Sequence, residues 1–262
     1  MIIQLPNGLL DGMDLFNYAD VDELRGKQQN YLADKDLVIG NIGHVPKILE
    51  DMVLSLQTKE GLKWGGKISE ALYKLPVGDL ETILIKVREN TYGPRFYHEA
   101  ECSHCKHNNK NLRLDLDKLA LDVMSLDDML KKKDVALPKS KILVELKPAY
   151  MKDLFEIVKL THSNKHNTII TSLLSISINK LGFPNKEKEG EYSWVSPVKN
   201  TDIDNIPASD LLHIQEQVKG VKLEGSIDTD IEVTCSNCGQ DFKVKLNPLD
   251  PNFFDPTRAS QT

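Results

Sequence analysis

The sequence lacks any long apolar run and any recognisable export signal. No stretch of roughly 18 apolar residues, the length a helix needs to cross a bilayer, occurs among the 262 residues. The segment from Met1 to Gly8 lacks the basic start, apolar centre and small-residue cleavage site of a signal peptide. We therefore expect a protein of the cytoplasm that has no membrane partner.

Positive charge is also in short supply. The chain has 33 basic against 39 acidic residues, a formal net charge of -6, and it has no basic cluster with interleaved aromatic residues. A surface that binds nucleic acid neutralises many phosphates and is normally rich in lysine and arginine. A zinc-dependent nucleic-acid-binding protein is therefore the least favoured of the functions we consider, and we expect no nucleic-acid partner.

Motifs of catalysis are missing as well. The sequence contains neither a phosphate-binding loop nor a nucleophile elbow, and no paired catalytic carboxylates. Four scattered histidines have no carboxylate at the spacing of a metal site or catalytic triad: His44, His162, His166 and His213. We expect that the protein is not an enzyme.

The four cysteines form two Cys-x-x-Cys pairs. Cys102 and Cys105 make the first pair, and Cys235 and Cys238 make the second. In a chain without an export signal, such thiols are more often metal ligands than disulfide partners. Alternating apolar residues lead into and out of each pair, which places each pair at the tip of a β-hairpin and not at the helix start of a thioredoxin-like redox site.

Two cysteine hairpins together can supply one closed zinc site. Four thiolates satisfy tetrahedral zinc completely and leave no position for a catalytic water, so the site would be structural. The sequence predicts one zinc held by Cys102, Cys105, Cys235 and Cys238. The long separation between the pairs leaves two alternatives open: two sites completed by His104, His107 or outside ligands, and cysteines without metal.

Helical spacing of apolar residues dominates the rest of the chain. It runs through residues 14–59, where residues 45–56 form the clearest amphipathic pattern, and it returns over residues 80–87. Further helical spacing covers residues 154–160 and 169–178, and a strand pattern covers residues 142–146. We therefore predict a mixed α+β protein that is predominantly helical and carries two β-hairpins.

The end of the chain repeats its middle. Residues 206–210, Ile-Pro-Ala-Ser-Asp, echo residues 75–79, Leu-Pro-Val-Gly-Asp. In both places a predicted helix follows, and then a cysteine hairpin. The common order of elements indicates an internal helix-hairpin repeat.

These patterns predict two lobes. Residues 1–126 form an N-terminal helical lobe with the first hairpin, residues 127–141 a charged linker, and residues 142–262 a second lobe with the second hairpin and the tail. A shared zinc would then join the lobes. The adjacent Phe253 and Phe254 of the tail must be buried, either against the hairpins or on a partner.

Three stretches of the sequence resemble a known family. They are residues 75–93, from the repeated motif to Tyr-Gly, residues 231–239 around the second cysteine pair, and Phe253-Phe254. Together they resemble the baseplate hub assembly proteins of T-even-like contractile-tailed bacteriophages. The similarity covers roughly residues 40–120 and 200–255, and the four cysteines match the family's cysteine pattern.

The resemblance implies a role in viral tail assembly. It suggests a late viral protein that acts in the host cytoplasm as a chaperone or scaffold for the central hub of the baseplate, with hub proteins as partners, and that is absent from the mature virion. The alternative is a permanent structural subunit of the hub. Whether the chain associates with itself is left open by the sequence.

Overall fold

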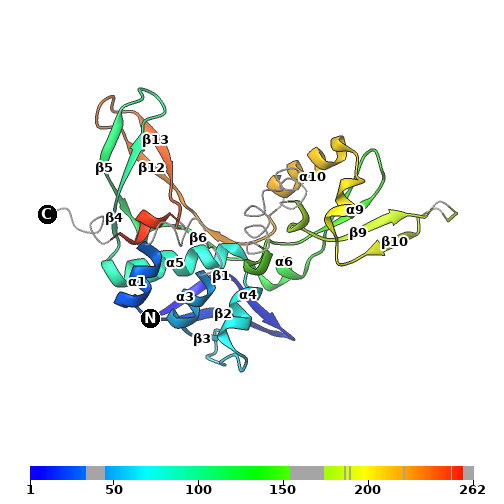
Figure 1. Ribbon diagram of the computed structural model, residues 1–262, viewed down its shortest axis with the longest axis horizontal. Helices are drawn as coiled ribbons and strands as arrows, with labels where there is room; N and C mark the ends of the chain where they lie inside the picture. The colour runs from blue at the N-terminus through cyan, green and yellow to red at the C-terminus, as the bar shows by residue number, and fades with distance from the viewer. Residues whose placement is uncertain are drawn as a thin grey trace. The chain divides into compact units, whose positions relative to one another are not determined.

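The computed structural model describes residues 1–33, 45–153, 174–185, 187–188, 190–220, 222–248 and 250–255 (Figure 1). The chain forms two compact units. Unit 1 comprises Met1–Val123 and Gly225–Thr262, and unit 2 comprises Met124–Glu224, so unit 2 is inserted into the chain of unit 1. Among the described residues, no helix is both long enough and apolar enough to cross a membrane.

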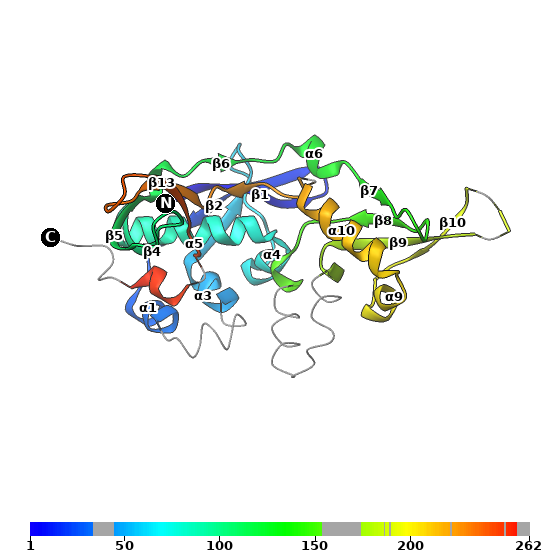
Figure 2. The same ribbon diagram turned by 90° about the horizontal axis from the view of Figure 1, so that it is seen from above.

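Unit 1 is built on a three-stranded antiparallel sheet. Its strands are β1 (Ile2–Asp11), β2 (Asp14–Val21) and β3 (Val53–Gln57), in the spatial order β1-β2-β3. The long helix α5 (Val77–Tyr92) lies along β1 (Figure 2). It buries four apolar side chains at helical spacing, Leu80, Ile83, Leu84 and Val87, which confirms the helix predicted there.

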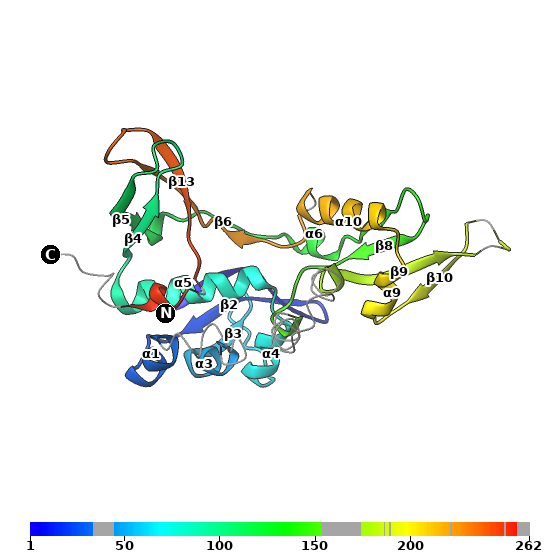
Figure 3. The ribbon, with the colours of Figure 1, turned by 45° about the horizontal axis from the view of Figure 1, so that its top comes forward.

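Shorter elements complete unit 1. The helices are α1 (Gly26–Ala33), α3 (Val45–Met52) and α4 (Ile68–Lys74), with a 3-10 turn η2 (Leu116–Lys118). Strands β4 (Arg95–Glu101) and β5 (Asn108–Asp115) form one hairpin, and β12 (Asp230–Thr234) and β13 (Asp241–Lys245) form another. The two hairpins stand side by side (Figure 3). Both predicted cysteine hairpins are therefore present, and both belong to unit 1, whereas the sequence-based boundaries assigned them to different lobes.

The chain leaves and re-enters unit 1 through a pair of short strands. Strand β6 (Leu121–Asp122) precedes the exit, and β11 (Ser226–Ile227) follows the return. They pair antiparallel, with Leu121 opposite Ile227. The two ends of the insertion are thus adjacent in unit 1.

The C-terminal turn packs inside unit 1. In the 3-10 turn η4 (Pro251–Phe254), Phe253 is only 1% exposed and meets the ring of Phe96 edge-on at 5.3 Å. The buried guanidinium of Arg88 stacks on both rings, and its Nε donates to the carbonyl oxygen of Phe253 at 2.8 Å. Burial lowers the pKa of Arg88 to about 10, so it stays charged at neutral pH. The two tail phenylalanines therefore fill the core of unit 1.

Unit 2 contains a four-stranded antiparallel sheet. Its strands lie in the order β10 (Tyr192–Val195), β9 (Ile178–Pro184), β8 (Leu143–Leu146) and β7 (Lys133–Ala136). Among its described residues, the helices are α6 (Leu126–Leu130), α9 (Asn200–Asp204) and α10 (Ala208–Gly220). Ile214 of α10 is buried in one apolar cluster with Val144 and Leu181 of the sheet. This cluster is the core of unit 2.

The predicted repeat extends to a matching pair of buried aspartates. Asp79 is the third residue of α5, and its two carboxylate oxygens accept the backbone N–H groups of residues 7–8 at 2.8 Å each. Asp210 is the third residue of α10 and accepts the N–H groups of residues 139–140 at 3.1 and 2.8 Å. The carboxylate of Asp79 therefore fixes the irregular part of β1, and that of Asp210 fixes the turn between β7 and β8. A cysteine hairpin then follows each helix in the chain.

The prediction of a predominantly helical protein is wrong. Strands account for 35% and helices for 30% of the structure, and the strands of the described residues form five antiparallel sheets. Residues 14–21 and 53–57, expected to be helical, are strands β2 and β3. Val53 and Leu56 share a helical spacing, but β-branched Val53 favours a strand, and β3 gains the backbone hydrogen bonds of β2.

Of the elements predicted for residues 127–178, one strand is confirmed and the linker is wrong. Residues 127–141, expected to be a solvated linker, contain most of α6 and the whole of β7, and β7 pairs with β8. The predicted strand over residues 142–146 is confirmed as β8. The helices predicted over residues 154–160 and 169–178 lie almost entirely outside the described residues, and Ile178 begins β9.

Candidate metal centre

The two hairpin tips have the same backbone shape. In the first tip, the N–H of Lys106 donates to the carbonyl oxygen of Cys102 at 3.0 Å, and Lys106 has a φ of 63°. In the second tip, the N–H of Gly239 donates to the carbonyl oxygen of Cys235 at 3.0 Å, and Gly239 has a φ of 69°. Each tight turn brings its two sulfur atoms to the same side of the tip.

The structure brings all four predicted cysteines together. Their Sγ atoms all lie within 4.8 Å of one another. Across the hairpins, Sγ of Cys102 lies 3.8 Å from Sγ of Cys238, and Sγ of Cys105 lies 3.7 Å from Sγ of Cys235. A tetrahedral zinc with bonds of about 2.3 Å requires ligand sulfurs about 3.8 Å apart. The donor atoms and their spacing therefore fit one tetrahedral metal ion.

The predicted alternative of two sites completed by histidine finds less support in the geometry. Neither His104 nor His107 belongs to the cluster, which is the one group of potential metal ligands within the described part of the chain. The Nε2 atom of His104 instead lies 3.1 Å from the carbonyl oxygen of Asp241. All four cysteines are free thiols, because a disulfide needs sulfurs about 2.0 Å apart.

Comparison with known families assigns the chain. Residues 42–255 match the family described as T4 bacteriophage base plate protein. The chain belongs to this family. The match spans both cysteine hairpins and η4, and it confirms the family resemblance seen in the sequence. No curated protein and no solved structure matches the chain. Membership in the family gives the protein a role in the phage baseplate, among other baseplate proteins.

Hydrogen bonds favour thiolates at two of the baseplate protein's cysteines. Burial opposes ionisation of Cys235, but the backbone N–H groups of Cys238 and Asn237 and the side chain of Asn109 together lower its pKa to about 6. For Cys105, the backbone N–H of His107 is the main cause of a lowered pKa. The sulfur of Cys235 is therefore mostly ionised at neutral pH, as a metal ligand must be, and the pKa of Cys105 is shifted in the same direction.

Cys238 behaves in the opposite way. The backbone N–H of Gln240 lowers its pKa, but burial and the three neighbouring cysteine side chains outweigh this bond and raise the pKa to about 12. Without a metal, thiolates so close together repel one another, so Cys238 keeps its proton. A divalent ion would displace that proton, which makes metal binding dependent on pH.

One polar contact of the cluster was missed by sequence reasoning. Asn109 of β5 is 2% exposed, and its Nδ2 lies 3.6 Å from Sγ of Cys235 on the other hairpin. The sequence carries a weak signal, because Asn108, Asn109 and Asn111 fall in one strand although asparagine is depleted from strands. Which of the three points inward follows only from the register of the hairpin.

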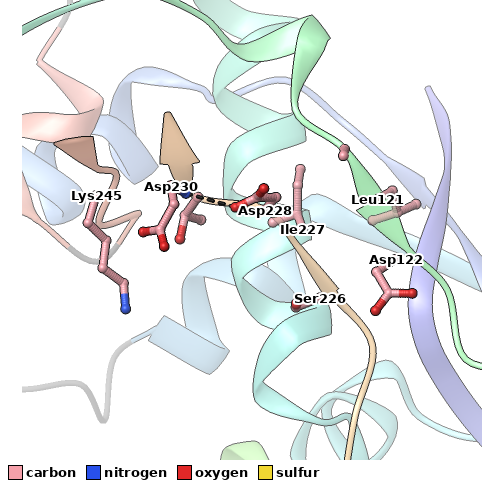
Figure 4. Close-up of a pocket in the computed structure, with 9 residues that line it drawn as sticks. Leu121, Asp122, Ser226, Ile227, Asp228, Asp230 and Lys245 are labelled. Carbon is pink, nitrogen blue, oxygen red and sulfur yellow. Dashed lines mark hydrogen bonds between the residues drawn. The ribbon is translucent and has the colours of Figure 1, made fainter. Parts of the chain in front are cut away.

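Unit 1 of the baseplate protein also contains an acidic cavity (Figure 4). It has a volume of about 570 Å³ and is lined by Asp122, Asp228 and Asp230, with Lys245 from the strand paired with Asp230. The N–H of Asp230 donates to Asp228 Oδ1 at 2.9 Å (Figure 4). All three carboxylates are exposed, and a solvated acidic cluster of this kind identifies no ligand.

Proposed function

We propose that this baseplate protein is a non-enzymatic assembly factor for the central hub of the phage tail baseplate. The observation that carries the proposal is the family match over residues 42–255. The factor acts in the host cytoplasm as a chaperone or scaffold, and its partners are hub proteins. The four-cysteine cluster suits such a role, because a closed metal site stabilises a binding surface without offering a position for substrate.

We further propose that the metal is one structural zinc. Four thiolates in a tetrahedron form a soft donor set that selects zinc or iron over magnesium and calcium. Cys102, Cys105, Cys235 and Cys238 would hold the ion, which supplies the positive charge that lets four crowded sulfurs remain ionised together. The zinc thus ties the two hairpins of unit 1 to each other, and it contributes directly to the folding free energy of that unit.

Metal analysis of the purified chain tests the zinc proposal. We expect one zinc per chain in the wild type and none when all four cysteines are changed to serine. Ser103→Ala is the matched control, because Ser103 is an exposed residue between two of the ligands and should keep the full metal content. A wild-type chain without metal, or a four-serine variant that retains zinc, would overturn the proposal. Bound iron in place of zinc would also overturn it and would give the purified protein a red colour.

Mass spectrometry of phage particles tests the assembly role. An assembly factor should be present in hub intermediates isolated from infected cells and absent from purified virions. In cells, phage carrying the four-serine variant should accumulate fewer hub intermediates than phage carrying Ser103→Ala. A stoichiometric amount of the chain in purified virions would instead establish the alternative, a permanent subunit of the hub.

A further inference from the structure

A buried asparagine links the two cysteine hairpins. Asn109 of β5 crosses to the second hairpin, where its Oδ1 accepts hydrogen bonds from the backbone N–H and the hydroxyl of Ser236, both at 2.9 Å. Its Nδ2 donates to Sγ of Cys235 at 3.6 Å and to the carbonyl oxygen of His107 at 3.2 Å. The side chain is thus fully hydrogen-bonded, although Asn109 is only 2% exposed.

The second hairpin of the repeat has an apolar residue at the position that Asn109 occupies in the first. Asn109 lies opposite Ala100 in the first hairpin, and Phe242 lies opposite Val233 at the equivalent place in the second. Phe242 is buried in the apolar cluster between the hairpins. Packing alone therefore favours an apolar residue here. A buried amide costs stability unless it is hydrogen-bonded, so the bonds to the second hairpin account for Asn109.

Further contacts join the two hairpins, and one of them runs from the second hairpin to the first. Asn237 of the second tip donates through Nδ2 to Sγ of Cys105 at 3.7 Å, so each hairpin contributes an asparagine to a sulfur of the other. The ring of His104 meets the carbonyl oxygen of Asp241 at 3.1 Å. An apolar cluster that includes Leu112 and Phe242 fills the space between the strands. None of these contacts needs a metal ion.

We propose that Asn109 is a positioning residue that mates the two hairpins before metal binds and holds Cys235 in the orientation of a ligand. This inference rests on the proposed zinc site. It predicts a preformed site, unlike that of a classical zinc finger, which is unfolded without its metal. Because the sulfurs are already placed, the ion binds without a folding step, and the asparagine bonds slow its release.

Zinc release to an excess of chelator tests this role. Removing a hydrogen-bond partner behind a metal ligand typically weakens metal binding by about 10–100-fold, so Asn109→Ala should release zinc faster by a factor of that order. The matched control is Asn108→Ala, because the neighbouring Asn108 is exposed and its side chain donates to Glu99 of the same hairpin. The control should release zinc at the wild-type rate.

A second variant separates the oxygen of the amide from its nitrogen. Asn109→Asp keeps the oxygen that accepts from Ser236, but it replaces the nitrogen that donates to Cys235 and to the carbonyl oxygen of His107 with a second oxygen. We expect it to keep the hairpins together, to release zinc faster than wild type, and to shift the thiolate-to-metal bands of the cobalt-substituted protein. A merely structural role for Asn109 would leave those bands unchanged in this variant.

Hydrogen exchange of the metal-free chain supplies a readout independent of zinc. The amide of Ser236 should be protected in the wild type and in Asn109→Asp, and should exchange freely in Asn109→Ala. Free exchange of this amide in the metal-free wild type would overturn the preformed site, and equal zinc release from Asn109→Ala and Asn108→Ala would overturn the positioning role. If the wild type binds no metal, the zinc proposal fails, and protection of Ser236 alone decides whether Asn109 mates the hairpins.

Discussion

Asp79 makes the stability of unit 1 depend on pH. It is completely buried, and burial raises its pKa from 3.8 to about 7, although the backbone N–H groups of Asn7 and Gly8 favour the ionised form. In the unfolded chain the carboxyl regains water and its ordinary pKa. The folded state therefore binds the proton more tightly than the unfolded state does, and ionisation favours unfolding.

The direction and the size of the pH dependence follow from the difference between the folded and unfolded pKa values of Asp79. A raised folded-state pKa means that the contribution of Asp79 is fully present below pH 3.8, falls as the pH rises toward 7, and is lost above about 7. The shift from 3.8 to about 7 is worth about 4 kcal/mol at about 1.4 kcal/mol per pKa unit. A loss of that order is a large share of the stability of a domain, so the slope should be easy to measure.

Urea unfolding between pH 4.5 and pH 8 measures this slope. The two tryptophans lie in different units, so Trp64 reports on unit 1 alone in a Trp194→Phe background. Asp79→Asn should remove most of the slope. At pH 4.5 it should be less stable than the wild type by about 1–3 kcal/mol, because one N–H group loses its acceptor, and this deficit should shrink as the pH rises to 8. A flat wild-type profile, or an equal slope in Asp79→Asn, would refute the reasoning.

The equivalent carboxylate of unit 2 provides a contrast. Burial opposes ionisation of Asp210 too, but the side chain and backbone N–H of Ser140 outweigh burial and lower its pKa. Its contribution is therefore present above pH 3.8 and lost at lower pH. Asp210→Asn should leave the profile of unit 1 between pH 4.5 and pH 8 unchanged.

Two further substitutions test the packing of unit 1 by calorimetry. A Cβ at Gly78 would lie 2.3 Å from the backbone oxygen of Gly225, so Gly78→Ala should destabilise the unit by about 1–3 kcal/mol. The control is Gly65→Ala, which should leave stability unchanged because a Cβ there meets nothing within 4 Å. Equal effects of the two substitutions would contradict the close approach at Gly78. Phe253→Ala should lower the free energy of unfolding by about 3–5 kcal/mol, because the ring fills the core. The control is Leu54→Ala, at a side chain that is 57% exposed, and it should lower this free energy by under about 0.5 kcal/mol. A neutral Phe253→Ala would show that the tail does not pack against unit 1.

Elements with a clear period could be predicted from the sequence, and the others could not. Helix α5 has a regular apolar stripe, and the hairpins have alternating apolar residues around a fixed Cys-x-x-Cys spacing. Strand β1 instead buries residues 5–9 in succession, so its pattern shows no alternation. Strands β7 and β10 are four residues each, too short to show a period against charged or polar neighbours.

In the candidate site, the cysteines could be predicted from the sequence, but the contacts around them could not. The cysteines were predictable because thiols at this spacing have few other uses in a reduced protein. The contacts of Asn109 were not, because they depend on how one hairpin is registered against the other. The repeated aspartates were visible as a motif, but their acceptor role required knowledge of which N–H groups face them.

The insertion of unit 2 sets the order in which the protein can mature during translation. Cys105 and Cys235 are 130 positions apart. At the usual elongation rate of about 5–20 residues per second, the second cysteine pair is synthesised roughly 7 to 26 s after the first. The whole of unit 2 emerges from the ribosome in that interval, so it can fold while β6 still lacks its partner β11. If the proposed zinc binds, its capture follows the synthesis of unit 2, and a chain that ends within unit 2 has only the first pair of thiols.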